Sequence, residues 1–399
     1  MTVALLIAQA FALGLLIIRL WPGRTRRPAT APLTTEIRDT TVSVIVATLD
    51  EAARIGPCLA GLRAQQRPLL EILVVDSSSI DGTREIVETA RARDPRIRLL
   101  TDGPVPAGWV GKVWALEHGL RAARGEWVLG IDADTDPVPG MVAAAIAAAR
   151  ENGYSAVSFS PKFAAQGAQE QLIQPALLLT LVYRGGVVGS DPDPERVLAN
   201  GQCFLARRDV LVRHGGYQPA RASFADDVSL ARHLARRGER VGFLDGSRLY
   251  SVRSYHSAGE MWREWGRSLD LRNATSAWRQ WADIAFLTAV QGLPLVMSIA
   301  LGSAAAQSML SDPARWLLSV NLALVGIRLL LLRPLSRCYE RTHLTFWFSW
   351  LADPLAVARI VMSTVYRPRS WRGRRYDLDG SVQEGVEQPA EGTARGGHR

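Results

Sequence analysis

The chain has 399 residues, which is long enough for one large domain with additional segments, or for two domains. It carries 47 Lys and Arg residues against 38 Asp and Glu residues, and only Lys112 and Lys162 are lysines. No aromatic-rich RNA-binding motif and no zinc-finger spacing accompany this positive charge, so nucleic-acid binding is not expected. Three scattered cysteines give no disulfide framework. The basic residues cluster beside apolar runs, as expected for contact with anionic lipid headgroups.

Residues 1–21 are predicted to form an N-terminal transmembrane helix, because their apolar stretch approaches the roughly 20 residues needed to span a bilayer. No basic segment precedes the stretch and no small-residue cleavage site follows it, which argues against a cleaved signal peptide. A basic linker rich in Pro and Thr follows over 22–40. The positive-inside rule then places the N-terminus outside the cell and the rest of the linker in the cytoplasm.

Residues 41–280 are predicted to form a cytoplasmic α/β domain. Short apolar runs predict strands over 42–47, 72–75, 97–100 and 127–131, and helical patterns separate them over 52–66, 81–93 and 111–123. This alternation is typical of a doubly wound, mostly parallel sheet, in which ligands bind beyond the carboxyl ends of the strands. The second half is less regular, with a strand expected at 202–206 and helices over 169–188, 227–237 and 260–273.

The C-terminal third becomes apolar again. Runs over 284–301 and 316–332 predict a two-helix transmembrane hairpin within 283–332. A further apolar segment, 344–366, is interrupted by Asp353 and Pro354 and has basic residues on both sides, which favours an interfacial or re-entrant segment over a full crossing. The tail over 379–399 is expected to be disordered. The protein is therefore predicted to be a multi-pass protein of the cell membrane.

The motif GEWVLGIDADTDP places two carboxylates, Asp132 and Asp134, at the end of a predicted strand. Two hard oxygen ligands separated by one residue suit Mg²⁺ or Mn²⁺. Such a cation would bind a diphosphate and neutralise its charge as a leaving group. The alternative is that these acids only cap the next helix.

Three other residues are candidates for binding the donor. Asp76 ends a strand, where its carboxylate can accept a hydrogen bond from a base or a ribose hydroxyl, and Glu51 follows the first strand, where the sheet would contact a nucleoside. Asp50 and Asp81 are expected to cap helices. Lys112 begins a helix, where it can meet a phosphate or the edge of a base, and the alternative is an exposed lysine.

Two adjacent acids, Asp226 and Asp227, open an amphipathic helix. One of them can act as a general base toward an acceptor hydroxyl. Helix capping and complementation of the helix dipole explain the same pair equally well. Further along, Trp262 and Trp265 share one face of a predicted helix, which we expect to lie against lipid headgroups together with the helix over 169–188.

Together and in this order, the motifs over 41–273 resemble those of family-2 glycosyltransferases. The segment GWVGKVWAL and the flanking apolar runs are most similar to hopene-associated and carotenoid-type members. The resemblance implies a nucleotide-sugar-binding fold and inversion at the anomeric carbon. It makes Asp76 the nucleoside-binding acid, and it makes Asp132 and Asp134 the metal-binding pair, with Asp134 the more direct ligand.

The resemblance also implies roles on the acceptor side. Asp227 matches the second acid of the family's ED motif, the general base, and Asp226 stands where the Glu is usual. Trp262, Arg263 and Trp265 fall where processive members carry QxxRW. The string here is MWREW, which lacks the Gln and favours transfer of a single sugar.

The expected activity is inverting transfer of one sugar from a nucleotide-sugar to a membrane-lipid-like acceptor of isoprenoid, hopanoid or carotenoid type, with a divalent cation. One alternative is a processive transferase that resembles polysaccharide synthases. Another is a non-catalytic membrane scaffold with a degenerate fold, although the acids of all the motifs are present. A nucleotidyltransferase would need a Gly-rich phosphate loop after the first strand, and ATLDEAARIG lacks one.

Overall fold

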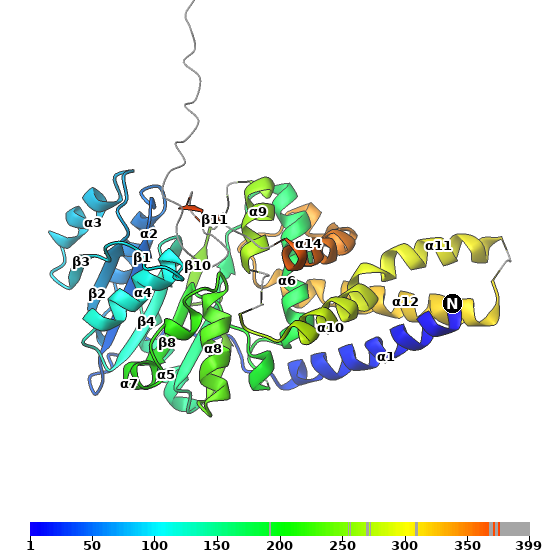
Figure 1. Cartoon of the computed structure of the whole chain (residues 1–399), viewed down its shortest axis with the longest axis horizontal. Coiled ribbons are helices and arrows are strands. Elements are labelled where there is room, and N and C mark those ends of the chain that lie inside the picture. The colour runs from blue at the N-terminus through cyan, green and yellow to red at the C-terminus, as the bar shows by residue number, and fades with distance from the viewer. Residues whose placement is uncertain are drawn as a thin grey trace, which may run out of the picture.

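The computed structural model describes residues 1–190, 193–253, 255, 257–268, 271, 273–307, 310–366, 370–371 and 374–375. The predicted disordered tail over 379–399 lies outside these residues. A seven-stranded sheet forms one end of the molecule, with strand order β3-β2-β1-β4-β8-β6-β9 (Figure 1). The strands are β1 (Val42–Thr48), β2 (Leu69–Asp76), β3 (Ile97–Thr101), β4 (Trp127–Asp132), β6 (Ala156–Ser160), β8 (Cys203–Arg207) and β9 (Val241–Asp245). Neighbours pair in parallel except at β8, which is antiparallel to both β4 and β6. The predicted mostly parallel sheet is confirmed.

Helices cover both faces of this sheet. They are α2 (Ile55–Arg63), α3 (Thr83–Arg91), α4 (Gly111–Ala122), α5 (Met141–Glu151), α7 (Arg208–Arg213) and α8 (Asp226–Arg236). In β1, Val44 and Val46 pack in the cluster formed with α2, α3 and α5, whereas Ile45 packs in the cluster formed with α4, α7 and α8. A strand buried on both faces needs apolar residues throughout, which explains the uninterrupted run in β1. The doubly wound arrangement is confirmed.

A three-stranded sheet lies beside the large one, and its first strand directly follows Asp132 and Asp134 in the chain. It consists of β5 (Thr135–Pro137), β10 (Tyr250–Val252) and β7 (Lys162–Phe163), in the order β5-β10-β7. β10 is antiparallel to β5 and parallel to β7. The small sheet therefore ties the segment after Asp134 to two later parts of the chain.

The first helix of the sheet domain begins later than predicted. α2 begins at Ile55 instead of residue 52, because residues 49–54 form a loop in which Asp50 has a φ of 53°. The Asp50 carboxylate accepts a hydrogen bond from the Ile80 N–H at 2.9 Å, so the prediction that Asp50 caps α2 is wrong. Asp81 accepts a hydrogen bond from the N–H of Thr83, the first residue of α3, at 3.0 Å, but the N-cap position is occupied by Gly82, so the prediction that Asp81 is the N-cap is wrong by one residue.

The basic linker is ordered and packs against the sheet domain. It starts with the short helix η1 (Trp21–Thr25) and continues as an extended segment. Three backbone hydrogen bonds hold it: Arg27 N to Gly189 O (3.1 Å), Thr30 N to Asp245 O (2.8 Å) and Leu33 N to Gly140 O (3.1 Å). Gly140 has a φ of 83°, and a Cβ there would lie 2.5 Å from the Leu33 carbonyl oxygen. The approach of the linker to α5 therefore requires glycine at this position.

A long helical projection extends from the sheet domain (Figure 1). It contains α1 (Thr2–Leu20), α10 (Ala277–Leu287), η4 (Thr288–Gly292), α11 (Pro294–Ala306) and α12 (Asp312–Leu330). The N-terminus lies at its far end, near the connection between α11 and α12. Inside the projection, Gln9 of α1 and Asn321 of α12 exchange hydrogen bonds of 3.0 and 2.8 Å. Polar residues of apolar helices are thus paired within the protein.

By length and composition, three helical segments could cross a membrane: 2–25, 312–336 and 344–365. The pair 277–292 and 294–306, bent by 45°, would make a fourth if it forms one span. The first predicted span and the run over 316–332 fall within two of these segments, and the run over 284–301 falls within the bent pair. The two-helix hairpin remains a prediction.

A block of helices lies between the sheet domain and the projection (Figure 1). It comprises α6 (Ala168–Gly185), α9 (Ala258–Ser268), α13 (Leu332–Ser336), η5 (Leu344–Ala352) and α14 (Asp353–Val365). The segment predicted to be re-entrant is η5 followed by α14, and both pack against α6. Asp353 forms a buried ion pair with Arg328 of α12 at 2.8 Å. The remaining short elements are η2 (Pro194–Arg196), η3 (Gln218–Ala220), β11 (Ser370–Trp371) and β12 (Arg374–Arg375).

Candidate active site

The candidate site lies at the carboxyl edge of the sheet, on both sides of β1. Thr48 at the end of β1 pairs with Asp76 of β2, and Ala47 pairs with Asp132 of β4. The chain leaves β1 toward β2 and returns on the other side as β4, which makes this position a topological switch point. The sheet therefore brings two of the predicted acids to one edge.

Asp132 and Asp134 lie in and beside the turn between β4 and β5. The Thr135 hydroxyl donates to the Asp132 carbonyl oxygen at 2.8 Å and closes this turn. The Asp132 side chain is 28% exposed, so solvent or a ligand can reach it. Both acids lie close to Cys58: its burial first, and then their charges, raise the pKa of the Cys58 thiol to about 12.

The chemistry of this pair fits a divalent cation held jointly with a substrate. Within the part of the chain that the structure describes, no group of three or more His, Cys, Asp or Glu side chains is arranged to bind a metal. Mg²⁺ is commonly bound by one or two carboxylates, with phosphate oxygens and water completing the coordination. Asp132 and Asp134 therefore suit a cation that arrives with a diphosphate.

Asp226 and Asp227 begin α8 and face the same site. The Asp227 carboxylate accepts hydrogen bonds from the N–H groups of Gly201, at 2.7 Å, and Val228, at 2.8 Å. Burial, and then the charge of Asp226, raise the pKa of Asp227 to about 7, although Lys112 acts in the opposite direction. Burial also raises the pKa of Asp226, again opposed by Lys112. A carboxylate with a pKa near neutrality is well matched to general-base chemistry.

Lys112 connects the two halves of the site. Its Nζ lies 2.7 Å from Asp132 Oδ1, and a Cβ added to Gly201 would lie 3.1 Å from the same Nζ. Burial acts to lower the pKa of Lys112, but Asp132, Asp226 and Asp227 together hold it above its usual value. The Lys112 side chain is 19% exposed, so the alternative of a solvated surface lysine is wrong.

The two predicted nucleoside-binding acids are both buried and both paired with arginine. Asp76 accepts from Arg84 Nη1 at 2.9 Å and from the Ser79 N–H at 3.2 Å. Glu51 lies 2.9 Å from Arg54 Nε. The Arg84 side chain is 42% exposed while that of Asp76 is fully buried. At this part of the edge, the charge that faces solvent is therefore the guanidinium of Arg84.

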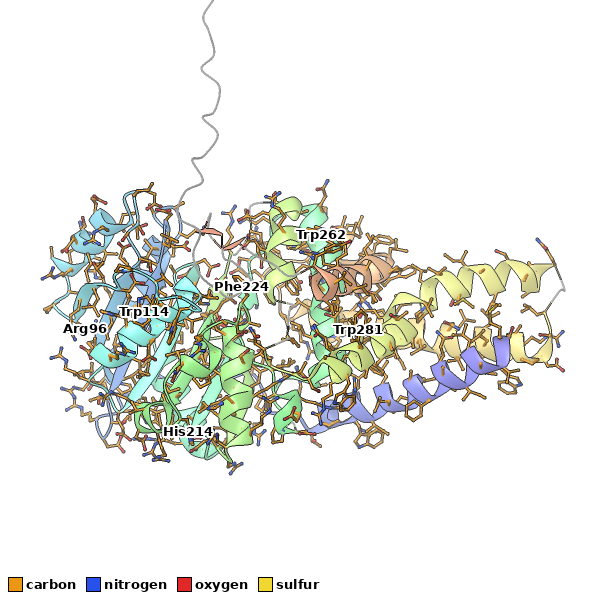
Figure 2. All side chains as sticks on the ribbon, viewed as in Figure 1. Arg96, Trp114, His214, Phe224, Trp262 and Trp281 are labelled. Atoms are coloured by element: carbon orange, nitrogen blue, oxygen red, sulfur yellow. The ribbon has the colours of Figure 1, made fainter. Side chains whose placement is uncertain are left out.

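The predicted acceptor-side residues lie on α9, in the block of helices. Trp265 is 6% exposed and packs in an apolar cluster with residues of α6 and α14. The Trp262 carbonyl accepts from Arg359 Nε at 2.8 Å, and the guanidinium of Arg359 lies 5.5 Å from the Trp262 ring (Figure 2). Arg263 is exposed. The expectation that Trp265 faces lipid is wrong, because helices from distant parts of the sequence cover it.

The same correction applies to α6, which was expected to face lipid. Ten of its residues are buried, among them Gln174, Leu177 and Tyr183, because α9, α14 and η5 pack around it. This helix instead forms the centre of the block that joins the sheet domain to the projection.

Sequence reasoning missed Gly201 and Tyr250. Gly201 supplies the N–H that binds Asp227, and the Tyr250 hydroxyl donates to the Phe159 carbonyl at 2.6 Å. Burial raises the pKa of Tyr250, and the charges of Asp132, Asp134 and Asp227 add to this. Tyr250 therefore forms part of the wall next to all three acids.

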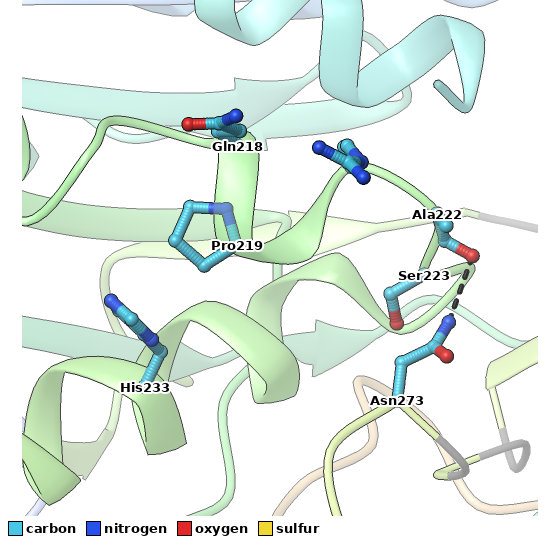
Figure 3. A pocket seen from close by; sticks show the side chains of 7 residues that line it. Gln218, Pro219, Ala222, Ser223, His233 and Asn273 are labelled. Carbon is cyan, nitrogen blue, oxygen red and sulfur yellow. Dashed lines mark hydrogen bonds between the residues drawn. The ribbon is translucent and has the colours of Figure 1, made fainter. Parts of the chain in front are cut away.

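A cavity of about 480 Å³ lies on the flank of α8 (Figure 3). Its lining residues are Gln218, Pro219, Arg221, Ala222, Ser223, His233 and Asn273. Asn273 Nδ2 donates to the Ala222 carbonyl at 2.8 Å, which closes one side. The lining includes none of the predicted site residues. The segment from Ala222 leads within a few residues to Asp226, so the cavity adjoins the site without being its centre.

Comparison with known proteins agrees with this geometry. Residues 43–211 match the family described as glycosyl transferase family 2. The putative glycosyltransferase EpsH of Bacillus subtilis (strain 168) is 32% identical over 93 residues, covering 23% of this chain and 26% of the relative. The succinoglycan biosynthesis protein ExoO of Rhizobium meliloti (strain 1021) is 35% identical over 95 residues, covering 23% of this chain and 25% of the relative. The chain thus spans about a quarter of the length of these curated relatives.

A solved structure extends the comparison to the helices. The mannosyltransferase PcManGT from Pyrobaculum calidifontis, in complex with GDP-Man and Mn²⁺, superposes with a TM-score of 0.57 at 22% identity. The match covers 92% of this chain and 99% of that chain, so the two share a fold that includes most of the molecule. The family match over residues 43–211 covers less than half of the chain. It supports the predicted family for this part of the chain.

Proposed function

We propose that this protein transfers a single sugar, with inversion, from a nucleotide-sugar to a membrane-lipid-like acceptor, with the help of Mg²⁺ or Mn²⁺. The observation that carries the proposal is the convergence of Asp132, Asp227 and Lys112 at one edge of the sheet. The GDP-Man and Mn²⁺ bound by the mannosyltransferase of similar fold support a nucleotide-sugar and a cation here as well.

Each residue at the edge has a defined role in this reaction. Asp132 and Asp134 would hold the cation, which would supply Lewis-acid stabilisation of the departing nucleoside diphosphate. Asp227 accepts the proton of the acceptor hydroxyl while that oxygen attacks the anomeric carbon. The Gly201 N–H holds the Asp227 carboxylate at 2.7 Å and so orients it. Lys112 keeps a positive charge between the two carboxylate groups, next to the position of the diphosphate.

The lipid-like acceptor is supported by the position of the apolar helices. The block of α6, α9 and α14 lies directly between the sheet domain and the projection (Figure 1). Trp21, Trp278 and Trp281 are 61%, 68% and 52% exposed near the base of the projection, as expected for residues at the headgroup level. An acceptor dissolved in the cytoplasmic leaflet would therefore be close to the site. An isoprenoid, hopanoid or carotenoid alcohol fits this arrangement.

A donor screen tests the proposal. Purified protein is incubated with individual nucleotide-sugars and Mg²⁺ or Mn²⁺, and release of the nucleoside diphosphate is measured. We expect cation-dependent hydrolysis of one donor class, lost in Asp134→Ala. A non-catalytic scaffold would release no nucleotide and would show no cation-dependent thermal stabilisation by nucleoside diphosphates, and that result would refute the proposal.

A processive transferase is the competing enzymatic function. Its products would carry several sugars per acceptor, whereas the MWREW string of α9 favours one. Mass spectrometry of glycolipid products distinguishes the two functions. A series of products that differ by one sugar unit would show that the protein synthesises a polymer, and would contradict transfer of a single sugar.

A further inference from the structure

Three buried guanidinium groups meet where the sheet domain joins the helices. Arg19 lies at the C-terminal end of α1, Arg184 at the C-terminal end of α6, and Arg232 in α8. We call them the buried arginine cluster. The Arg19 side chain is 8% exposed, and Arg184 and Arg232 are 5% and 4% exposed. Figure 1 shows the ends of α1 and α6 adjoining one another beside α8.

The cluster has little compensating negative charge among the described residues. Asp283 of α10 is the carboxylate that acts on all three arginines, and it lies 3.9 Å from Arg19 Nη2. Glu195 also acts on Arg232, but Arg236 and Arg279 already bind it at hydrogen-bond distance. Within the described chain, Asp283 is therefore the one carboxylate that acts on all three arginines and is not already bound by Arg236 and Arg279.

The hydrogen bonds of the cluster are made to neutral groups. Arg19 Nη1 donates to the Tyr183 carbonyl at 2.9 Å, Arg232 Nε to the Val197 carbonyl at 3.0 Å, and Arg184 Nε to the Thr180 carbonyl at 3.3 Å. Two buried donors, Arg184 Nη2 and Arg19 Nε, have no hydrogen-bond acceptor in the described part of the chain.

Such a cluster of positive charges is energetically unfavourable unless a negatively charged group binds to it. A buried polar group without a partner costs about 1–3 kcal/mol, and more when it is charged. Burial lowers the pKa of Arg232 to about 10, which leaves the guanidinium positive at neutral pH. The arginines therefore cannot relieve the repulsion by losing protons. The Arg19 guanidinium lies 4.1 Å from the centre of the Phe286 ring, but a ring brings no net negative charge, which an external anion would supply.

The surroundings indicate where that anion comes from. Arg19 lies in the last turn of α1, which is within the candidate membrane span 2–25, so the cluster lies at the end of an apolar segment. The exposed Trp21 follows directly, and the exposed Trp281 is two residues from Asp283 (Figure 2). Exposed tryptophans at the end of an apolar helix indicate the headgroup level of a bilayer, where lipid phosphates are abundant.

We propose that the buried arginine cluster binds the phosphate group of a membrane lipid. Planar guanidinium groups recognise phosphate through paired hydrogen bonds, and a phosphate oxygen would satisfy the donors of Arg184 and Arg19. This site is separate from the edge that carries Asp132 and Asp227, and it does not depend on sugar transfer. Bound lipid would join α1, α6 and α8 at the base of the projection.

Thermal unfolding of the full chain tests this proposal in a maltoside detergent that contains no phosphate. Two additions are compared at constant ionic strength: inorganic phosphate, and phosphatidylglycerol mixed into the detergent. We expect phosphatidylglycerol to raise the Tm of the wild-type protein by at least about 2 °C. Arg184→Met should lose this rise. Its Tm without lipid should equal or exceed the wild-type value, because an uncompensated buried charge has been removed.

Arg279→Met is the matched control. It removes the same charge from an exposed side chain nearby, and should keep the full rise with phosphatidylglycerol. Arg232→Gln is the second cluster variant, which serves if Arg184→Met does not fold, and it should also lose the rise. Native mass spectrometry then counts the phosphatidylglycerol molecules that remain bound to each variant.

The outcomes separate the possible sources of the phosphate. A rise with phosphatidylglycerol, with or without a rise with inorganic phosphate, supports the lipid assignment when the cluster variants lose it. A rise with inorganic phosphate alone would overturn that assignment in favour of a soluble anion. An equal rise in the wild type and both cluster variants, or none in the wild type, would overturn the site itself.

Discussion

Replacing Asp227 with Asn probes the chemical step most directly. The amide keeps the size of the side chain but cannot accept the proton of an acceptor hydroxyl. A positioned general base contributes about 10²–10⁴-fold, which corresponds to about 3–5 kcal/mol in the activation barrier. We expect kcat for sugar transfer to fall by that factor, while donor binding, measured by calorimetry with the nucleoside diphosphate and Mn²⁺, changes little.

The pH dependence gives a second measure of the same role. Because burial and Asp226 raise the pKa of Asp227 to about 7, the base is protonated below neutrality and ionised above it. We therefore expect kcat/KM of the wild-type enzyme to rise with pH through about 7. Asp226→Asn should shift the midpoint downward, since it removes the neighbouring negative charge, and Lys112→Met should shift it upward, since it removes the compensating positive charge.

Two results would refute this reasoning. One is an Asp227→Asn enzyme that keeps more than about a tenth of wild-type kcat, which is far above the range for a lost base. The other is a wild-type profile that is flat between pH 5.5 and 8.5, together with an unchanged profile in Asp226→Asn. Either result would make Asp227 a helix-capping residue, with Asp226 the next candidate for the base.

Three further predictions concern the metal, the stability and the topology. Asp134→Ala should abolish transfer and lower Mn²⁺ affinity by calorimetry with little change in Tm, and full activity in excess chelator would contradict the metal role. Glu71 is buried, and although burial alone would raise its pKa, hydrogen bonds from Arg124, Ser43 and Arg98 lower it to about 2. Its contribution to stability should be complete above pH 4.5 and decline as the pH falls toward 2, and denaturant titrations should show this decline in wild type but not in Glu71→Gln. In a background without native cysteines, a cysteine at position 311 should react with an impermeant reagent in intact cells and one at position 375 should not, and the opposite pattern would invert the topology.

Much of the sheet and its edge could be predicted from the sequence. Strands β1 to β4 are compact apolar runs, and the donor-side acids Asp76, Asp132 and Asp134 directly end or follow two of them. The helix α5 was missed because its sequence, MVAAAIAAARE, is apolar on nearly every side and shows no amphipathic period. Strands β6 and β9 were missed because Ser158 and Gly242 interrupt their short apolar runs.

Contacts between distant segments could not be predicted in the same way. The pair of tryptophans on α9 has the spacing of a surface stripe, yet Trp265 is buried, because α6 and α14 reach it from about 80 and 90 residues away. Lys112 was expected to meet a ligand, but its contact with Asp132 depends on how α4 packs over β1 and β2. The arginines at positions 19, 184 and 232 carry no local motif at all. Only the tertiary structure brings them together.

The hydrogen-bonded linker has a consequence for how the enzyme meets its acceptor. Backbone hydrogen bonds from Arg27, Thr30 and Leu33 reach three different parts of the domain and hold the linker between α1 and the sheet in place. Under the proposed function, the active site would then stay at a constant height above the bilayer instead of moving on a flexible linker. A lipid acceptor would reach it by lateral diffusion, which is a two-dimensional search. Inserting glycines into the linker would let the distance between the active site and the bilayer vary, while every proposed catalytic side chain stays unchanged.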